Sequence, residues 1–159
     1  MSSTIYTVMQ RGDESNWIIK AFSNKEAAEE HIVQLKDNQT KFKAVADLVT
    51  AFRAHYYTQN KQPQYPSHLR LPKVKFPGRA EEITQAMRDE RAHAIEHNKQ
   101  IDNEHAQKMG EYSVQLNDAL ATFLKSLNVQ QDWQDKFLTG HYFESEMYGE
   151  FYICETELD

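Results

Sequence analysis

The two ends of the chain carry short runs of β-branched and aromatic residues. Residues 5–10 and 17–22 are two such runs, and the polar residues 11–16 separate them. This pattern predicts an antiparallel hairpin. Residues 150–158 have a similar composition and predict a closing strand that pairs with the hairpin. We also consider a further strand over residues 142–148.

A helical pattern follows the predicted hairpin directly. Ser23 stands three residues before Glu26, which is the spacing of a capping box at the start of a helix. Ala28, Ile32 and Leu35 then fall on one face of a helix. We therefore expect this helix to begin at Ser23 and to run to about residue 37.

Helical spacing dominates the middle of the chain. Apolar residues recur every three or four positions over residues 42–56 and again over residues 79–127. All four prolines lie between these two segments, where each removes an amide donor and disfavours helix in the preceding residue. A last helix over residues 131–138 should end at Gly140, since glycine suits a left-handed C-cap.

These elements predict an α+β fold in a single domain, residues 1–159. A small antiparallel sheet and one helix, from residues 1–37 and 141–159, would form a β-β-α-β module. Residues 38–140 would be a large helical insertion into that module, and the insertion would contain a proline-rich basic loop over residues 59–78.

The apolar stripe of the long helix over residues 79–127 is weaker in its first half. Glu90, His97 and His105 stand there at positions that the stripe would otherwise fill with apolar residues. A solvent-reaching arm or a wet seam between helices would have this pattern. Gly110 is a candidate kink. The same helix could also support a homodimer.

Composition places the chain among ordinary globular proteins. It has 159 residues, of which 40% are hydrophobic and 26% charged, and this length is sufficient for a core. Its apolar runs are far shorter than the roughly 20 residues that span a bilayer. The first residues lack a secretion-signal pattern, and the single cysteine, Cys154, fits a reducing compartment. We therefore expect a cytoplasmic location.

Charge is segregated along the chain. The net charge is -6, yet residues 48–80 contain no Asp or Glu. Basic and aromatic residues are interleaved in and around the loop, as in surfaces that contact a partner. We predict a partner-binding site formed by Arg53, Tyr56, Tyr57, Lys61, Tyr65, Arg70, Lys73, Lys75, Phe76 and Arg79.

Several binding partners would suit these basic and aromatic residues. They could dock on the acidic C-terminal residues of the same protein, or they could bind an acidic protein partner. Alternatively, the cations could neutralise phosphates while the rings stack on the bases of single-stranded nucleic acid. The acidic C-terminal residues could themselves imitate phosphates in a nucleic-acid channel of another protein.

Catalytic and metal-binding motifs are scarce. Glu90, His93 and His97 would lie on adjoining rows of a helix, where they could share a metal, but a second Glu-x-x-His is lacking. A solvated helix face is the simpler interpretation. No nucleophile elbow, phosphate-binding loop or dinucleotide fingerprint is present. We therefore expect neither enzymatic activity nor a cofactor.

Both ends of the chain resemble known sequences. Tyr6-x-Val8 with Trp17-Ile18-Ile19, then Ala21-Phe22-Ser23-Asn24-Lys25-Glu26-Ala27-Ala28-Glu29, and finally Phe151-Tyr152-Ile153-Cys154-Glu155-Thr156-Glu157-Leu158 carry the resemblance. They resemble small uncharacterised proteins of bacteriophages and mobile elements, and are similar in outline to some phage anti-CRISPR inhibitors.

That resemblance implies a non-enzymatic protein-binding inhibitor or accessory protein in the host cytoplasm. Its target would be a host defence complex or another nucleic-acid-handling complex. None of the insertion shares the resemblance, so partner choice would be encoded there. The alternatives that stay open are a single-stranded nucleic-acid-binding protein and a metal-binding helical protein.

Overall fold

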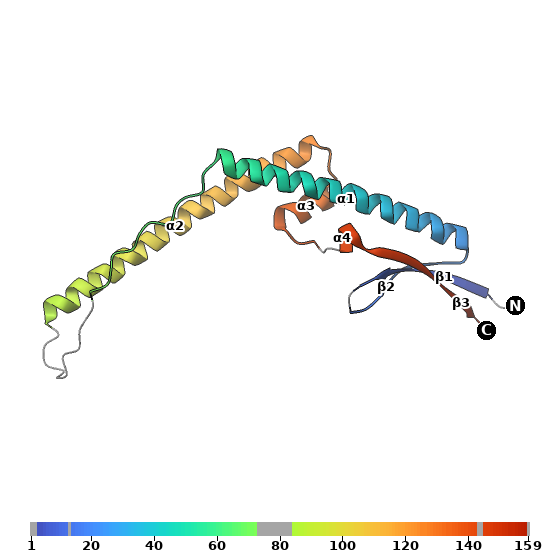
Figure 1. Ribbon diagram of the computed structural model, residues 1–159, viewed down its shortest axis with the longest axis horizontal. Helices are drawn as coiled ribbons and strands as arrows, with labels where there is room; N and C mark the ends of the chain where they lie inside the picture. The colour runs from blue at the N-terminus through green and yellow to red at the C-terminus, as the bar shows by residue number, and fades with distance from the viewer. Residues whose placement is uncertain (1–2, 13, 73–83, 143–144, 159) are drawn as a thin grey trace. The chain divides into compact units, whose positions relative to one another are not determined.

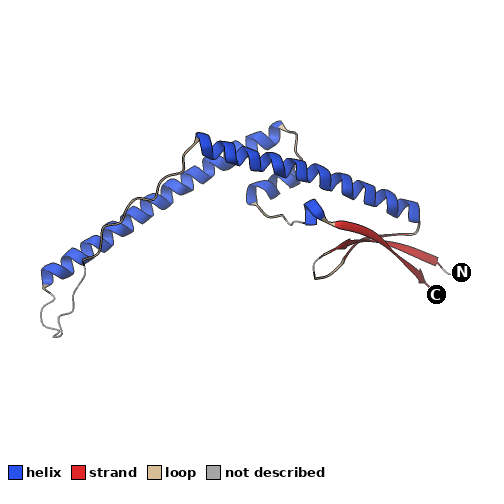
Figure 2. Cartoon of the chain, in the orientation of Figure 1, coloured by secondary structure: helices blue, strands red, loops and turns tan. Residues whose placement is uncertain are grey.

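The computed structural model describes residues 3–12, 14–72, 84–142 and 145–158. Its fold is α+β, as the sequence predicts, with a three-stranded antiparallel sheet and two long helices (Figures 1 and 2). The chain divides into two compact units. We refer to Met1–His55 with Leu120–Asp159 as the sheet unit, and to Tyr56–Ala119 as the strap unit.

The sheet brings together the two ends of the chain. Its strands are β1 (Ser3–Arg11), β2 (Trp17–Phe22) and β3 (Glu150–Leu158), in the order β2-β1-β3. Both pairings are antiparallel, and the β1–β2 register shifts between Val8 and Met9. The predicted hairpin and closing strand are confirmed. In addition, β1 extends beyond the predicted residues 5–10 at both of its ends.

The helix that follows the hairpin, α1 (Lys25–Gln59), begins one residue later than a Ser23 cap would place it. Asn24 is the N-cap, because its side-chain oxygen accepts a hydrogen bond from the Ala27 amide at 3.1 Å. The predicted capping box at Ser23 is therefore wrong. α1 is also one continuous helix of 35 residues, so residue 38, where we predicted the insertion to begin, lies inside it.

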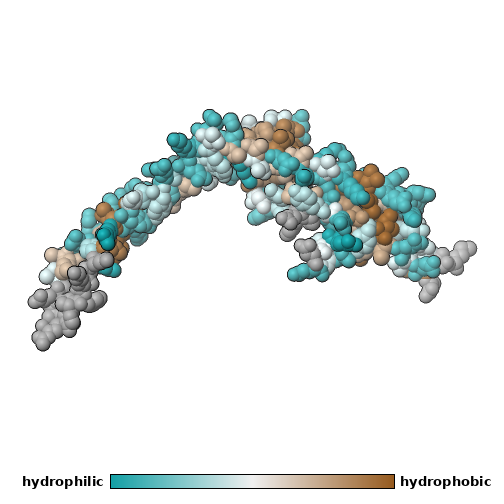
Figure 3. Space-filling view, in the orientation of Figure 1, coloured by the Kyte–Doolittle hydropathy of each residue, from teal (hydrophilic) through white to brown (hydrophobic). Residues whose placement is uncertain are grey.

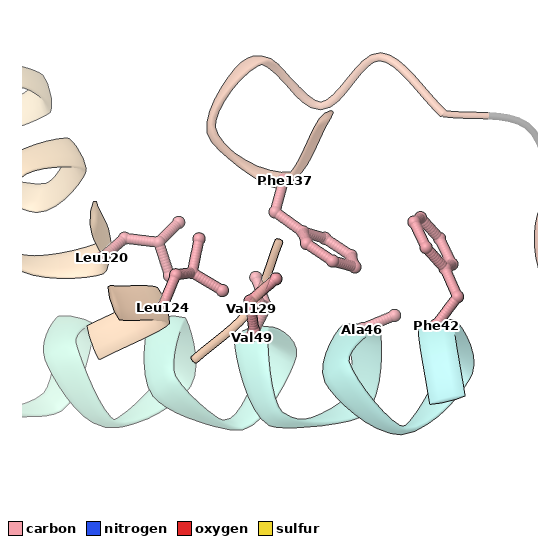
Figure 4. Packing of buried hydrophobic residues seen from close by; sticks show 7 residues of the cluster. All are labelled: Phe42, Ala46, Val49, Leu120, Leu124, Val129 and Phe137. Atoms are coloured by element: carbon pink, nitrogen blue, oxygen red, sulfur yellow. The ribbon is translucent and has the colours of Figure 1, made fainter. Parts of the chain in front are cut away.

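The hydrophobic core of the sheet unit lies where three helices meet (Figure 4). α1 contributes three residues at helical spacing, and Phe42 stacks on Phe137 of α3 (Gln131–Thr139) with ring centroids 4.8 Å apart. Leu120 and Leu124 come from the end of α2 (Gln85–Ser126), and both are fully buried. The cluster consists of Phe42, Ala46, Val49, Leu120, Leu124, Val129 and Phe137.

The chain returns from this core to the sheet through two short elements. α3 ends at Gly140, whose φ of 72° is left-handed, and the Gly140 amide donates to the Lys136 carbonyl at 2.8 Å. This confirms the predicted C-cap. The strand considered over residues 142–148 is wrong, since Ser145–Tyr148 form a helical turn, α4. Glu146 in that turn pairs with Lys136, and Met147 packs against the core.

The strap unit contains the end of α1, the segment 60–72 and most of α2. Residues 60–72, which we refer to as the strap, have no regular secondary structure, in agreement with the prolines there. α2 runs through Gly110 without interruption, so the candidate kink does not break the helix. The predicted start of this helix at residue 79 lies outside the described residues. None of the described helices combines the length and apolar composition that crossing a membrane requires.

Candidate partner-binding site

The strap lies along α2, antiparallel to it, and polar side chains of the helix hold it there (Figure 1). Asn98 makes the most regular contact. Its Oδ1 accepts from the Leu69 amide at 2.7 Å, and its Nδ2 donates to the Leu69 carbonyl at 2.9 Å. A side-chain amide thus satisfies both backbone groups of one strap residue, much as a neighbouring β-strand would.

Asp102, one helical turn beyond Asn98, holds the strap through side chains. The Tyr65 hydroxyl donates to Asp102 Oδ1, and His68 Nε2 lies 2.6 Å from the same oxygen. The Tyr65 hydroxyl also lies 3.1 Å from His68 Nε2. The three groups therefore share one small polar cluster, which stays partly open to solvent.

This cluster shifts the pKa of two of its members in opposite directions. The hydrogen bond to Asp102 raises the pKa of Tyr65, and desolvation and the negative charge of the carboxylate add to the effect. The Tyr65 hydroxyl and His68 together lower the pKa of Asp102. The neutral phenol and the ionised carboxylate stabilise each other, so this pair persists over a wide pH range.

The imidazole ring of His105 packs against the ring of Tyr65. The two rings meet edge to face, with centroids 4.7 Å apart. His105 Nδ1 is buried and has no hydrogen-bond partner among the described residues. A cavity of about 170 Å³ adjoins it and is lined by Gln64, Pro66, Ile101, Glu104, His105 and Lys108.

Tyr112 anchors the beginning of the strap. Its hydroxyl donates to the Asn60 carbonyl at 2.7 Å. The Tyr56 and Tyr57 rings pack on Tyr112, with centroid distances of 5.8 and 6.4 Å. Burial raises the pKa of Tyr112, and Tyr56 and Tyr57 add to this effect. The predicted Tyr56 and Tyr57 are thus joined to the strap through Tyr112 of α2.

The predicted partner-binding residues fall into three groups. Tyr57, Lys61, Tyr65 and Arg70 are exposed in the strap unit, where Lys61 and Arg70 form no ion pair with a described carboxylate. Tyr56 is half-buried there. Arg53 is half-buried in the sheet unit, where its guanidinium donates to the Phe137 carbonyl at 2.8 Å. The others lie outside the described residues: Lys73, Lys75, Phe76 and Arg79.

Sequence analysis missed Asn98, Asp102 and His68. Asn98, Asp102, His105 and Tyr112 stand at intervals of four, three and seven residues, so they lie along one face of α2. The weak first half of the apolar stripe was therefore a usable indication of this face. The sequence alone does not show that the strap contacts this face of α2.

Glu90, His93 and His97, the metal-binding alternative, are not assembled into a site in the described part of α2. The His93 and His97 rings are stacked 6.4 Å apart on α2, and both residues are exposed, as is Glu90. In residues 3–12, 14–72, 84–142 and 145–158, no group of three or more His, Cys, Asp or Glu side chains is arranged to hold a metal. The strap contacts, rather than these histidines, are the best-defined polar arrangement of the unit.

The charge of the strap unit bears on which partner it could take. Tyr56–Ala119 contains nine Lys and Arg and nine Asp and Glu, so its formal net charge is zero and the whole net charge of -6 belongs to the sheet unit. A surface that follows nucleic acid needs an excess of cations. Comparisons of the chain with protein-family models, with curated proteins and with solved structures find no match.

Proposed function

We propose that this protein is a non-enzymatic protein-binding protein whose strap unit is the contact surface for its partner. One observation carries the proposal. Of the described residues of Tyr56–Ala119, Ala94, Tyr112 and Leu116 alone are buried. A segment of this size that buries so little surface gains little stability from its own core, and binding a partner would bury more.

Exposed apolar side chains also favour the strap unit as the contact surface. Among the described residues of the strap unit, seven large hydrophobic residues are exposed: Tyr57, Tyr65, Leu69, Leu71, Met87, Ile95 and Val114. The Asn98 side chain holds Leu69 through two backbone hydrogen bonds, which we refer to as the clamp. Ile95 lies one helical turn before Asn98, so apolar residues stand beside the clamp. Figure 3 shows hydrophobic (brown) surface beside the grey residues, within a largely hydrophilic unit. Aromatic and apolar side chains of this kind are typical anchors of protein interfaces.

A protein partner fits the charges better than nucleic acid does. The equal numbers of acidic and basic residues in this unit provide no net attraction for a phosphate backbone. Mixed charges around apolar anchors are instead the usual composition of a protein interface rim. The strap unit therefore supports a protein-binding role over single-stranded nucleic-acid binding.

The more specific role that we propose is that of an inhibitor or accessory protein from a phage or mobile element. The target would be a host defence complex, as for anti-CRISPR proteins, or another nucleic-acid-handling complex in the host cytoplasm. This part rests on the resemblance of the two chain ends. It predicts that the captured partner belongs to such a complex.

Affinity capture with paired variants tests the proposal. The strap-unit variant is Leu69→Ser with Ile95→Ser, and the matched control is Val33→Ser with Leu48→Ser on the sheet-unit part of α1. All four residues are exposed, between 45% and 66%, so both variants should fold. We expect the strap-unit variant to lose the proteins that the control and the unchanged protein recover. Equal recovery by both variants would contradict the proposal.

A further inference from the structure

β3 is an edge strand with an unusually regular pairing. All nine of its residues pair with β1, from Ser3 opposite Leu158 to Arg11 opposite Glu150, without a register shift. β1 occupies one side of β3, and no described strand pairs with the other side. Five consecutive residues, 154–158, are exposed. The outer edge of β3 therefore presents backbone donors and acceptors to which another strand could add.

The opposite edge of the sheet is less suited to strand addition. β2 has only six residues, and its register with β1 shifts between Val8 and Met9. A bulge of this kind twists an edge and interrupts its row of backbone groups. β2 also carries a cation, Lys20. The two edges thus differ in length, regularity and charge.

Acidic side chains mark the outer part of β3. Glu155 lies opposite Tyr6 and Glu157 opposite Thr4, so both carboxylates are on one face of the sheet. Both are exposed, and neither forms an ion pair with a described residue. Glu150, at the other end of β3, is paired with Arg11. Free negative charge is therefore concentrated toward the C-terminal half of the strand.

The surroundings reinforce this negative charge. The first turns of α1 lie at the same end of the sheet unit as the two termini (Figure 1), and Glu26, Glu29 and Glu30 are exposed on those turns. The sheet unit carries the whole formal charge of -6. Two β3 strands pairing antiparallel would bring like charges together, which destabilises a sheet. A cationic strand would meet no such repulsion.

We propose that the outer edge of β3 binds an extended cationic segment of a protein partner by strand addition. Lys or Arg at alternate positions of that segment would lie beside Glu155 and Glu157. Main-chain hydrogen bonds would provide sequence-independent affinity, and the two carboxylates would select the cationic sequence. This surface is separate from the strap unit and does not depend on the function proposed for it.

A synthetic peptide tests the proposal on the full-length protein. The probe is a fluorescent octapeptide of alternating Lys and Val, and the measurement is fluorescence anisotropy. We expect saturable binding that weakens about two- to thirtyfold in Glu155→Gln with Glu157→Gln, since each opposite-charge pair contributes roughly 0.2–1 kcal/mol. The control, Glu90→Gln with Glu96→Gln, removes equal charge from exposed positions of α2 and should change the affinity less than twofold.

A second peptide separates strand addition from simple ionic attraction. N-methylation of every central amide removes the hydrogen-bond donors and keeps the charge, so this peptide should not bind. Equal binding of the methylated peptide would overturn the proposal, as would equal binding by the β3 variant and its control. A failure of the unmodified peptide to bind at low salt would also overturn it. The methylated peptide is compared on the unchanged protein, so that result does not depend on how any variant folds.

Discussion

The side-chain amide of Asn98 hydrogen-bonds both backbone groups of Leu69, accepting from its amide at 2.7 Å and donating to its carbonyl at 2.9 Å. Two residues 29 positions apart are thereby fixed to one another. Because Asn98 hydrogen-bonds only backbone atoms of Leu69, this contact does not depend on which side chain stands at position 69. Leu69 itself remains 45% exposed beside the clamp, available to a partner.

Replacement of Asn98 by Ala should loosen the strap and leave the sheet unit unchanged. A net hydrogen bond contributes about 0.5–1.5 kcal/mol, so the free energy of strap opening should fall by about 1–3 kcal/mol. Hydrogen exchange of residues 60–72 measures this change. Asn103→Ala, at an exposed position of the same helix, is the control. Unchanged strap protection in Asn98→Ala would show that the clamp does not hold the strap.

The Tyr65–Asp102 contact should be visible in the titration of both groups. The pKa of Asp102 is lowered from 3.8, so its contribution to strap docking is complete above about pH 4 and is lost as pH falls through the lowered pKa. The pKa of Tyr65 is raised from 10.0, so its contribution is complete below about pH 10 and is lost as pH rises through the raised pKa.

Carbon NMR of labelled Tyr65 checks this coupling. Asp102→Asn removes the carboxylate charge, so the Tyr65 pKa should fall toward 10.0. Glu96→Gln, which removes a charge from an exposed position elsewhere on α2, should leave it unchanged. The same Tyr65 titration curve in the unchanged protein and in Asp102→Asn would refute the contact.

Leu120 should be among the most costly residues to truncate. It is fully buried in the core cluster of the sheet unit, and Leu→Ala substitutions at such positions cost about 2–5 kcal/mol. Urea unfolding should show this loss for Leu120→Ala. Val114, also on α2 but 60% exposed, should tolerate Ala within about 0.5 kcal/mol. Similar losses for the two variants would contradict the position of the core.

Arg53 should behave as a residue of the fold rather than of the interface. Its guanidinium donates to the Phe137 carbonyl at 2.8 Å, and hydrogen bonds of charged groups contribute about 1.5–3 kcal/mol. Arg53→Ala should therefore lower the free energy of unfolding by about that amount, whereas the exposed Arg70→Ala should change it by at most about 0.5 kcal/mol. A loss of partner binding in Arg53→Ala with unchanged stability would instead place Arg53 in the interface.

Sequence alone predicted the elements whose residues specify them locally. The β-branched and aromatic runs located β2 and β3 at their observed bounds, and Gly140 correctly marked the end of α3. Residues 38–41, which lie between the two predicted helical segments, belong to α1 as well. They stay helical because no Gly or Pro interrupts them, and Lys41 pairs with Asp37 at 2.7 Å one turn away.

The candidate site could be predicted only in part. The aromatic and basic residues before and within the strap were recognisable from composition, and Tyr57, Lys61, Tyr65 and Arg70 are exposed as a contact surface requires. Asn98 and Asp102 were not recognisable, because their role depends on contacts with residues about 30 positions earlier. In a sequence, an isolated Asn or Asp on a polar helix gives the same pattern whether its side chain contacts water or the backbone of another segment.

Site-specific photocrosslinking in cells shows whether the strap unit contacts a protein partner. A photoreactive amino acid would replace Leu69 in the strap unit or, as the control, Leu48 in the sheet unit; both positions are 45% exposed. If the strap unit is the contact surface, the probe at position 69 should crosslink a discrete protein partner and the probe at position 48 should not. A partner crosslinked from position 48 but not from position 69 would contradict the assignment of the strap unit as the contact surface.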